Sequence, residues 1–437
     1  METDKPLSSK RAVGIVWLTV FIDLVGFSII FPIFPAMLEW YLPRVAEGSL
    51  LQTLVSSLME ATSGNNQQFL VSVLFGGVLG SLYSLLQFVA SPLWGRLSDR
   101  YGRRPILLIT TTGTALSYLI WIFAGGFWVL IVARMIAGVM SGNIAVATAS
   151  IADLTESRQR SKGMALIGVA FGLGFILGPA IGGLGSLVDM GVDPSNMGSF
   201  ALTPFSFAAL LAFLLSLANV FWVWRAFPES NPVKARSDKT LVLRHLISFG
   251  SRIPDVRRTL KVYFIFIFAF SGMEFTLTFL ALERLFYRPQ DMALMFLFIG
   301  LVLSLTQGYA VRKYGHRFGE RNFATLGLFS GVLAMVCLSL SQSAGLFYTG
   351  LILLGFGVGC ASPSLSAMVS LYSPASQQGS ELGAFRSMGA LGRATGPIFG
   401  ALIFWKMGSQ VSYTAGAALL FMAALFSILL PKPGHSD

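Results

Sequence analysis

A small set of ionisable side chains lies within long apolar stretches, where a charge requires a specific reason. The acids are Asp23 and Glu274, and the bases are Arg134, Arg386 and Arg393. A charge near the centre of a bilayer costs roughly 2.5–3.5 kcal/mol on insertion scales, so each of these residues is a functional candidate. Buried acids can carry protons and buried arginines can bind carboxylates, so these residue types indicate proton transfer and anion recognition.

Asp23 is the candidate proton carrier of the first apolar stretch. It lies about ten residues, or roughly 15 Å of helix, beyond the start of that stretch. Burial favours the neutral acid and a nearby cation favours the carboxylate, and a proton carrier needs both influences. We therefore expect Asp23 to titrate, with Arg134 stabilising its ionised form in one conformation only. The alternative is a structural ion pair that never changes protonation.

Glu274 and two arginines form a second candidate site. Arg386 and Arg393 are seven residues apart, so they share one helix face at two depths. We expect Arg393, the deeper of the two, to receive a substrate carboxylate, with Glu274 as its partner when no substrate is bound. Phe27 and Phe275 would supply apolar walls for the substrate. The alternative is a self-neutralising charge cluster, and it stays open which of the two buried acids is the main titrating group.

The composition is that of a membrane protein. Of the 437 residues, 54% are hydrophobic and only 12% are charged, which is far from the balance of a soluble globular chain. The apolar runs are continuous and do not alternate with period two, so we expect spanning helices. Cys337 and Cys360 both lie in apolar runs and support neither a disulfide nor a metal site. Because the chain also lacks a Gly-x-x-x-x-Gly-Lys-Ser/Thr loop, we expect no metal, no cofactor and no enzymatic activity.

Twelve apolar stretches are long enough to cross a bilayer, which needs about 20 residues per helix. We expect an all-α membrane protein whose twelve transmembrane helices form two pseudo-symmetric six-helix bundles. Residues 1–226 would form the N-terminal bundle, 227–259 a cytoplasmic linker with an interfacial helix, and 260–437 the C-terminal bundle. The expected spans are approximately 13–38, 69–94, 105–124, 127–149, 163–185, 204–226, 260–282, 292–311, 322–341, 346–369, 383–404 and 411–430.

The distribution of positive charge predicts the sidedness of the chain. Residues 95–105 form a glycine-bounded basic turn between the second and third stretches. Placing this turn in the cytoplasm puts 24 of the 31 Lys and Arg residues on the side of both termini and 4 on the other side. The charges thus follow a membrane topology, which argues against nucleic acid as a partner. Since the chain also lacks Asn-x-Ser/Thr sites, we expect a multi-pass protein of a bacterial inner membrane.

The two halves of the chain repeat short motifs at similar offsets. The basic turn at 95–105 is echoed 213 positions later, at 308–317. Gly178, Pro179 and Gly182 recur 218 positions later. Two related bundles joined by a linker predict transport by rocking of the bundles about a site near the bilayer midplane.

These motifs resemble signatures of the major facilitator superfamily over nearly the whole chain. The basic turn resembles the family motif between the second and third helices, and Arg134 resembles the arginine of the fourth helix. A glycine-rich segment resembles the fifth-helix signature of antiporters, and its residues are Gly174, Gly178, Pro179 and Gly182. The resemblance implies the fold and the twelve-span drug:proton antiporter branch of the family.

The surroundings of the buried charges resemble one part of that branch. The first stretch around Asp23 is similar to the first helix of tetracycline-efflux proteins. Residues 271–274 and 386–393 resemble segments of the tetracycline-transporter-like organic-anion transporters. The resemblance therefore implies export of organic anions or amphipathic drugs.

The resemblance also implies a gate at the basic turn. Asp99 would face the N-terminal end of the eleventh helix, where the helix dipole favours a carboxylate, and so hold the cytoplasmic side closed. The alternative is that Asp99 pairs with Arg100 or Arg103 and only fixes the turn. Charged residues at the end of the fourth stretch would join this network, namely Asp153, Glu156 and Arg158. The residues expected to form the gate are Gly95, Asp99, Arg100, Gly102 and Arg103.

Together the motifs predict a secondary transporter that is driven by protons and exports amphipathic organic solutes, such as organic anions or tetracycline-like drugs, by alternating access. We expect its partners to be protons, a small-molecule substrate and membrane lipid, and we expect a monomer. Two alternatives stay open at this point. One is a uniporter or proton symporter for a metabolite or lysolipid, and the other is a non-transporting membrane receptor or scaffold. The substrate, the direction of transport and the proton stoichiometry are not encoded in any motif found.

Overall fold

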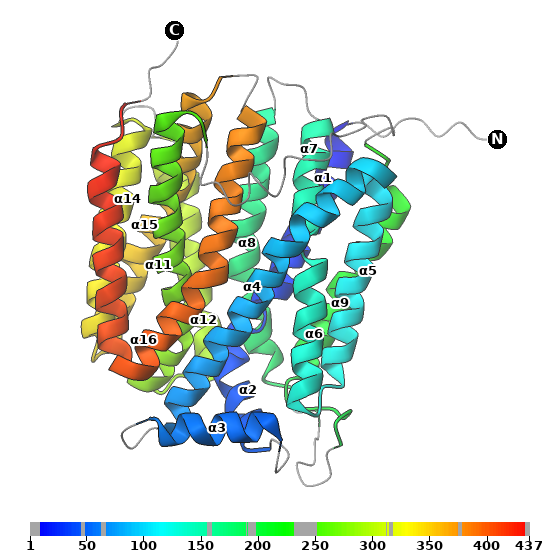
Figure 1. The fold of residues 1–437 in the computed structure, drawn as a ribbon, viewed down its shortest axis with the longest axis vertical. Helices are drawn as coiled ribbons and strands as arrows, with labels where there is room; N and C mark the ends of the chain where they lie inside the picture. The colour runs from blue at the N-terminus through cyan, green and yellow to red at the C-terminus, as the bar shows by residue number, and fades with distance from the viewer. Residues whose placement is uncertain are drawn as a thin grey trace, which may run out of the picture. The chain divides into compact units, whose positions relative to one another are not determined.

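The structure is a computed structural model, and it describes residues 9–44, 49–62, 67–154, 160–188, 190, 198–230, 251–311, 313, 318–374 and 378–432. Over these residues the chain is helical apart from short connections and an isolated β-bridge. The helical elements in chain order (Figure 1) are α1 (Ser9–Ser28), η1 (Phe31–Ile33), α2 (Phe34–Tyr41), η2 (Leu42–Arg44), α3 (Leu50–Glu60), α4 (Gln67–Tyr101), α5 (Arg103–Ile122), α6 (Phe127–Met140), α7 (Asn143–Leu154), α8 (Arg160–Gly185), α9 (Ser206–Ala226), α11 (Pro254–Leu285), α12 (Pro289–Leu305), η4 (Thr306–Val311), α14 (Glu320–Leu340), α15 (Ala344–Tyr372) and α16 (Gln378–Ile428).

Nine helical segments of the described chain are long and apolar enough to cross a membrane. One of them, Glu381–Ile428, holds two of the predicted spans, because Gly408 adopts a left-handed φ of 83° that interrupts the helix between them. Two further apolar helices are shorter, namely Gly172–Gly185 within α8 and Pro289–Leu305, which is α12. The twelve predicted spans are all present as helices, and the predicted all-α membrane fold is confirmed.

Prolines interrupt the first span. α1 ends at Ser28, and the chain passes through a turn and through η1 before α2 begins at Phe34. Pro32 and Pro35 lie at this interruption. A proline has no backbone N–H, and its ring clashes with the carbonyl of the preceding helical turn, so a continuous helix is disfavoured here. The interruption leaves Asp23 near the C-terminal end of α1.

The fourth span is also interrupted, between α6 and α7. Side chains of α4 bind the carbonyls next to this break: Trp94 Nε1 donates to the Val139 oxygen at 2.8 Å, and Gln87 Nε2 donates to the Ser141 oxygen at 3.2 Å. Carbonyls at a helix end lack intrahelical donors, so such partners stabilise the break. Glycine is needed at position 142, because a Cβ there would meet the Trp94 ring and the backbone of α4.

The chain divides into two compact units. The first contains the described parts of Met1–Ile33 and Leu86–Lys239, and the second contains those of Phe34–Leu85 and Thr240–Asp437. The division that the sequence predicts after residue 226 concerns the repeated halves of the chain. The compact units differ from those halves because the segment from α2 to the first part of α4 groups with the second unit.

Most of the predicted linker lies outside the described residues. Residues 231–250 of this linker, with the interfacial helix expected there, are not among the described ones, and near the end of the linker Pro254 begins α11. α11 therefore starts earlier than the predicted span. Proline is suited to this first helical position, because its fixed φ is helical and its missing N–H would have no partner there.

The basic turn is shorter than the sequence predicts. α4 continues as a helix to Tyr101 and α5 begins at Arg103, so the turn consists of Gly102, which has a φ of 99°. The interpretation of 95–105 as a long turn is wrong. A glycine inside a helix costs only about 1 kcal/mol, and Pro105 falls in the first turn of α5, where proline is tolerated.

In the first unit, glycines allow α8 to pack closely on α1. Three of them would place a Cβ against α1, and the pairs are Gly174–Leu24, Gly178–Val25 and Gly182–Ile29. Because the backbones approach closely, the Ser28 hydroxyl donates a hydrogen bond across this glycine interface to the Gly174 carbonyl at 3.0 Å. The segment that resembles the antiporter signature is thus the contact surface between α8 and α1.

The second unit repeats this interface between α16 and α11. The corresponding pairs are Gly392–Ile267, Gly396–Phe268 and Gly400–Gly272. Each glycine lies 218 positions after its counterpart in α8, and each partner lies 243 positions after its counterpart in α1. The repeat that the sequence predicts is therefore present in the helix contacts and not only in the motifs.

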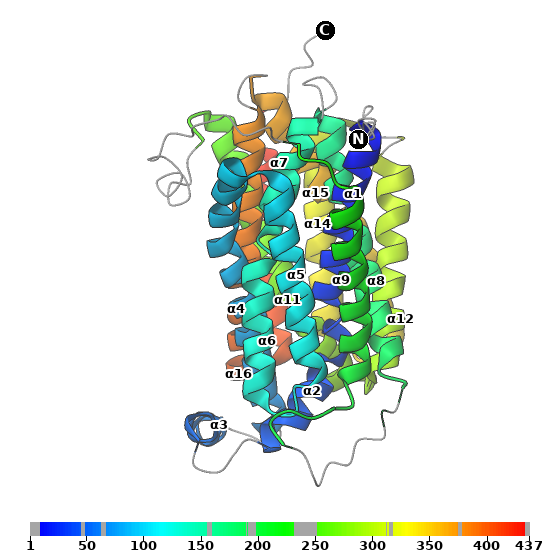
Figure 2. The same ribbon diagram turned by 90° about the vertical axis from the view of Figure 1, so that its right-hand side faces the viewer.

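The apolar segment before the second span forms α3, which belongs to the second unit. The Ser49 hydroxyl accepts a hydrogen bond from the Gln52 N–H at 3.2 Å and caps the helix. Val55 is buried, whereas Leu54 is half-exposed. α3 runs across the direction of α16 and does not lie alongside it (Figures 1 and 2). α3 is therefore an amphipathic helix that packs through one side.

Gly178→Ala is expected to lower the stability of the first unit by about 1–3 kcal/mol, because the added methyl group would overpack the interface against Val25 and Ser28. Gly172→Ala on the same helix is the matched control, since nothing lies within 4 Å of its Cβ position. Thermal unfolding in detergent compares the two. Equal melting temperatures for the two variants would contradict the close approach of α8 to α1.

Candidate functional site

Asp23 is buried in the first unit, with 6% of its surface exposed. The Nδ2 atom of Asn143 donates a hydrogen bond to Asp23 Oδ2. Asn143 is 1% exposed and is the first residue of α7, directly after the break in the fourth span. The acid that the sequence predicts to carry a proton therefore has an uncharged amide as its partner.

Two oxygen atoms of this pair have no hydrogen-bond partner within the described part of the chain, namely Asp23 Oδ1 and Asn143 Oδ1. A buried polar atom without a partner costs roughly 1–3 kcal/mol. Asn143 is not among the predicted site residues. An amide in an otherwise apolar stretch, directly after a glycine, is the signal that would have identified it.

Arg134 is buried on α6, with 4% of its surface exposed. Arg134 and Asp23 are thus both buried in the first unit. The alternative of a structural ion pair between them stays open. Stabilisation of ionised Asp23 by Arg134 in another conformation stays a prediction.

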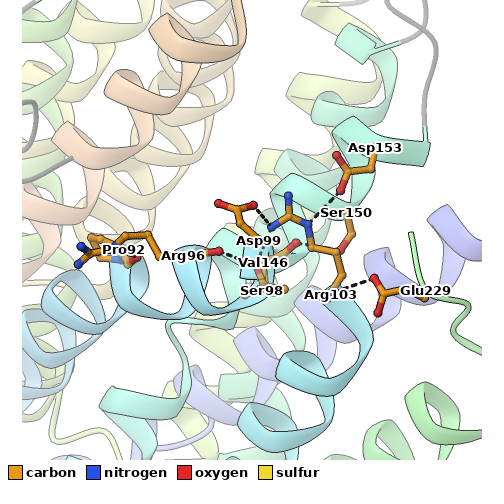
Figure 3. A network of polar contacts seen from close by, with 10 residues as sticks. Pro92, Arg96, Ser98, Asp99, Arg103, Val146, Ser150, Asp153 and Glu229 are labelled. Atoms are coloured by element: carbon orange, nitrogen blue, oxygen red, sulfur yellow. Dashed lines mark hydrogen bonds and ion pairs between the residues drawn. The ribbon is translucent and has the colours of Figure 1, made fainter. Parts of the chain in front are cut away.

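Arg103 is the centre of a polar network in the first unit (Figure 3). Its NH1 atom lies 2.6 Å from Asp99 Oδ1 and donates to the Ser98 hydroxyl at 2.6 Å. Its Nε atom lies 2.9 Å from Asp153 Oδ2. The guanidinium is buried and bridges two carboxylates, one from the end of α4 and one from the end of α7. This geometry joins three helices at one cation.

Two charged side chains cap the helix ends beside this network. Glu229 accepts hydrogen bonds from the backbone N–H groups of Arg103 at 2.8 Å and Arg104 at 3.1 Å, at the start of α5. Arg104 NH2 donates to the Trp224 carbonyl at 2.7 Å, near the end of α9. A carboxylate at a helix N-terminus and a guanidinium at a C-terminus both complement the helix dipoles. The start of α5 is thus bound to Glu229, which follows α9, and the end of α9 is bound to Arg104 of α5.

The residues predicted to form a gate are therefore distributed as follows. Asp99 pairs with Arg103, which matches the alternative considered for this turn, and a gating role stays a prediction. The Arg100 guanidinium lies over the Tyr101 ring, 5.2 Å from its centroid, and the Gly95 carbonyl accepts from the Ser98 hydroxyl at 2.7 Å. Asp153 joins the network as expected, whereas its expected companions Glu156 and Arg158 lie outside the described residues.

In the second unit, the structure brings Glu274 on α11 near Arg393 on α16, and the charge of Arg393 acts on the Glu274 carboxylate. Arg393 also forms a side-chain hydrogen bond with the Tyr263 hydroxyl, and the charge of Arg386 acts on the same hydroxyl. The three charged residues that the sequence predicts for a substrate site thus lie in one cluster. A tyrosine joins them.

Tyr263 is held firmly in this cluster. Its ring stacks on Phe385, with 3.6 Å between the centroids and 17° between the planes, and Gly389 leaves room for it, because a Cβ there would lie 3.0 Å from the ring. Tyr263 precedes Glu274 by 11 residues, about three helical turns, so both lie on one face of α11. This spacing would have indicated Tyr263 from the sequence.

The two predicted aromatic residues pack against other rings. Phe27 in the first unit contacts Phe31 and Phe175 edge to face, with 5.3 Å and 5.7 Å between the centroids. Phe275 in the second unit is buried and lies edge to face on Phe34 at 5.5 Å. Contact of either ring with a substrate stays a prediction.

A family model described as "Major Facilitator Superfamily" matches residues 16–340 and 314–437. "Major facilitator superfamily domain-containing protein 10" of Mus musculus is 32% identical over 457 residues, covering 99% of this chain and 96% of that protein. "Tetracycline resistance protein, class B" of Escherichia coli is 30% identical over 332 residues, covering 75% of this chain and 78% of that protein. The resemblance that the sequence motifs carry is confirmed.

Solved structures agree with this assignment. A crystal structure described as "the human organic anion transporter MFSD10 (TETRAN)" matches with a TM-score of 0.77 and 32% identity, covering 97% of this chain and 100% of that chain. The helices therefore follow the arrangement of a known membrane transporter, and the expectation that the chain is a transporter and not an enzyme is confirmed.

Glu229→Ala is expected to destabilise the first unit by about 1 kcal/mol, because the N-terminus of α5 loses its cap. Glu229→Gln keeps an acceptor oxygen without the charge, so its melting temperature should lie between those of Glu229→Ala and the parent. Thermal unfolding at low and high salt measures the effect, and salt should reduce the difference between Gln and Glu. A melting temperature of Glu229→Ala equal to that of the parent at low salt would contradict the capping role.

Proposed function

The chain belongs to the major facilitator superfamily, and from this premise we propose that it is a proton-coupled antiporter that exports organic anions or amphipathic drugs. The observation that carries the proposal is the presence of two polar sites of different chemistry, one buried in the first unit and one half-buried in the second. One is an acid paired with an amide in the first unit. The other is an acid with two arginines and a tyrosine in the second unit.

The first site suits a proton carrier. Burial of Asp23 favours the neutral acid, and the hydrogen bond from Asn143 favours the carboxylate. Because the amide of Asn143 carries no charge, this hydrogen bond does not lock Asp23 in the ionised form. The carboxyl group can therefore change protonation when its exposure to either side of the membrane changes. Arg134 would favour the ionised form in the conformation that releases the proton.

The second site suits an organic anion. The cluster contains the two guanidinium groups of Arg386 and Arg393 and the single carboxylate of Glu274, so a bound carboxylate or sulfonate would balance its charge. A guanidinium group presents a planar set of donors that matches a carboxylate in two hydrogen bonds. A substrate carboxylate would displace Glu274 from Arg393, so Glu274 would be the partner of Arg393 when no substrate is bound.

The similar proteins support the same class of substrate. The human relative whose crystal structure is known is described as an organic anion transporter. Relatives from Escherichia coli are described as tetracycline resistance proteins. Both descriptions concern amphipathic organic solutes. We therefore assign this chain an organic anion, or an amphipathic drug that carries an anionic group, as its substrate.

The repeated glycine interfaces support alternating access. In the family fold, two bundles rock about a central site, and each bundle must bend or slide without losing its packing. The smooth contacts of α8 with α1 and of α16 with α11 permit this movement. We further propose that a monomer spans a bacterial inner membrane with both termini in the cytoplasm, which the asymmetry of Lys and Arg supports.

Two other functions would give different results in a proteoliposome screen of organic anions and cations against an imposed pH step. A uniporter or proton symporter for a metabolite or lysolipid would move its substrate without the pH step, or in the same direction as protons. A non-transporting receptor or scaffold would move no substrate at all. Antiport requires that substrate accumulate on the side from which protons leave.

Asp23→Asn is expected to abolish proton-driven uptake into inverted proteoliposomes and to retain downhill exchange of substrate, because the amide keeps the size of the side chain but does not titrate. Flux of a labelled anion with and without a pH step measures both activities. Ser150→Ala, which removes a buried hydroxyl bonded to its own helix, is the control. Unchanged proton coupling in Asp23→Asn would refute the role of Asp23.

Arg393→Ala is expected to weaken binding of an anionic substrate by about 10-fold to 100-fold, which corresponds to the roughly 1.5–3 kcal/mol of a charge-assisted hydrogen bond. Arg393→Lys keeps the charge but loses the planar geometry, so its affinity should be intermediate. Equilibrium binding to the purified protein in detergent compares the variants with an uncharged analogue as control. Full affinity for the anion in Arg393→Ala would exclude Arg393 as its receptor.

A further inference from the structure

The pair of Asp23 and Asn143 can exist in two forms that differ in the number of hydrogen bonds. The amide nitrogen donates to Asp23 Oδ2, and the Oδ1 atom of each side chain has no partner within the described part of the chain. A proton on Asp23 Oδ1 would supply a donor, and Asn143 Oδ1 is an acceptor that lacks one. A carboxylic acid and a primary amide can therefore share two hydrogen bonds, whereas a carboxylate and the same amide share one.

Asn143 is placed so that this difference acts on a whole helix. It is the first residue of α7, which is separated from α6 by the break at Ser141 and Gly142. The backbone of α6 next to the break is held by Gln87 and Trp94 of α4. α7 is a 12-residue helix, roughly 18 Å long, that a turn at Ser141 and Gly142 joins to α6. A tilt of α7 about this turn would leave α6 in place.

The other end of α7 holds the central cation of the polar network. Asp153 is the residue before the last of α7, and its Oδ2 lies 2.9 Å from Arg103 Nε. Arg103 also binds Asp99 of α4 at 2.6 Å, so it connects α7 to the end of α4 (Figure 3). A tilt of α7 that starts at Asn143 must change the distance between Asp153 and Arg103.

We propose that Asn143 is a positioning residue that senses the protonation state of Asp23 and transmits it along α7 to Arg103. The inference rests on the proposed function, in which Asp23 carries the transported proton. When the carboxylate accepts a proton from the aqueous side, the second hydrogen bond draws the first turn of α7 toward α1. Asp153 then changes its contact with Arg103, and loss of the proton restores the single bond and the original contact.

α7, α8 and α9 pack against α1, and their charged residues lie in the end turns of each helix. These residues are Asp153 on α7, Arg160 and Lys162 on α8, and Arg225 on α9, and α1 itself carries Lys10 and Arg11 in its first turn. Arg134 of α6 is a further buried charge of this unit. The partner that touches the Asp23 carboxyl directly is Asn143.

Infrared difference spectra between high and low pH test the first half of the inference on the full-length protein in lipid nanodiscs. The parent should show a protonated-carboxyl band that Asp23→Asn removes. In Asn143→Ala the band should persist but move to higher frequency, because the carboxyl group loses its hydrogen bonds to the amide. A band at the parent frequency in Asn143→Ala would overturn the proposed pairing.

A fluorescent reporter tests the transmission along α7. Tyr101 is 54% exposed and adjoins Gly102, so a fluorophore on Tyr101→Cys reports on the network around Arg103 once Cys337 and Cys360 are replaced by serine. The parent emission should change with pH at the midpoint of the infrared band. Asn143→Ala and Asp153→Asn should each reduce the amplitude at least about fivefold, and Asp153→Asn should leave the infrared band at its parent frequency.

Ser150→Ala is the matched control on the same helix, because its hydroxyl donates to the Val146 carbonyl of α7 itself, at 2.9 Å, and this variant should keep the full amplitude. If Asn143→Ala does not fold, Asn143→Leu replaces the amide with an apolar group of similar volume and must give the same loss. An unchanged amplitude in the foldable variant overturns the inference and leaves the proposed function intact. Retention of the band and of proton-driven flux in Asp23→Asn would instead refute both.

Discussion

A carboxyl group buried among apolar helices must obtain from the fold the hydrogen bonds that water would otherwise supply, and much of the first unit depends on how Asp23 does so. Its partner Asn143 is available because the fourth span breaks directly before it. At that break Gly142 lets the chain approach α4 closely, and Gln87 and Trp94 of α4 donate to the carbonyls beside it. The surroundings of this one buried acid thus include an amide partner and a helix break that contacts α4.

The two units share a scaffold and differ in chemistry. Glycines of α8 and of α16 contact α1 and α11 at matching positions, so the close helix packing is repeated. The charged residues are not repeated with it. At the offset of 243 that relates α1 to α11, Asp23 corresponds to Phe266 and Glu274 corresponds to Phe31. The first unit therefore offers an acid with a neutral partner, and the second offers an acid with arginines. This difference suits proton transfer in the first unit and anion binding in the second.

Helix ends determine the arrangement around Arg103. Gly102 forms the turn, Glu229 caps the start of α5, and Arg104 binds the end of α9. Each charge lies where the dipole of a helix favours it, so these contacts are local and directional. The guanidinium of Arg103 then connects the ends of α4 and α7. A movement of α4 or α7 relative to α5 would therefore change the contacts of Arg103 with Asp99 or Asp153.

The amino-acid sequence by itself determined the twelve spans, the repeat and the buried charges, because the length of an apolar run and the cost of a charge inside it are local properties. It did not determine their partners. Asn143 and Tyr263 each carry a signal in the sequence, but only the fold places one against Asp23 and the other against Arg393. The tertiary structure also decided that the basic turn is the single residue Gly102, since only packing of α4, α5 and α9 shows where the helices end. Contacts across more than a hundred residues follow from how helices pack, which no local pattern encodes.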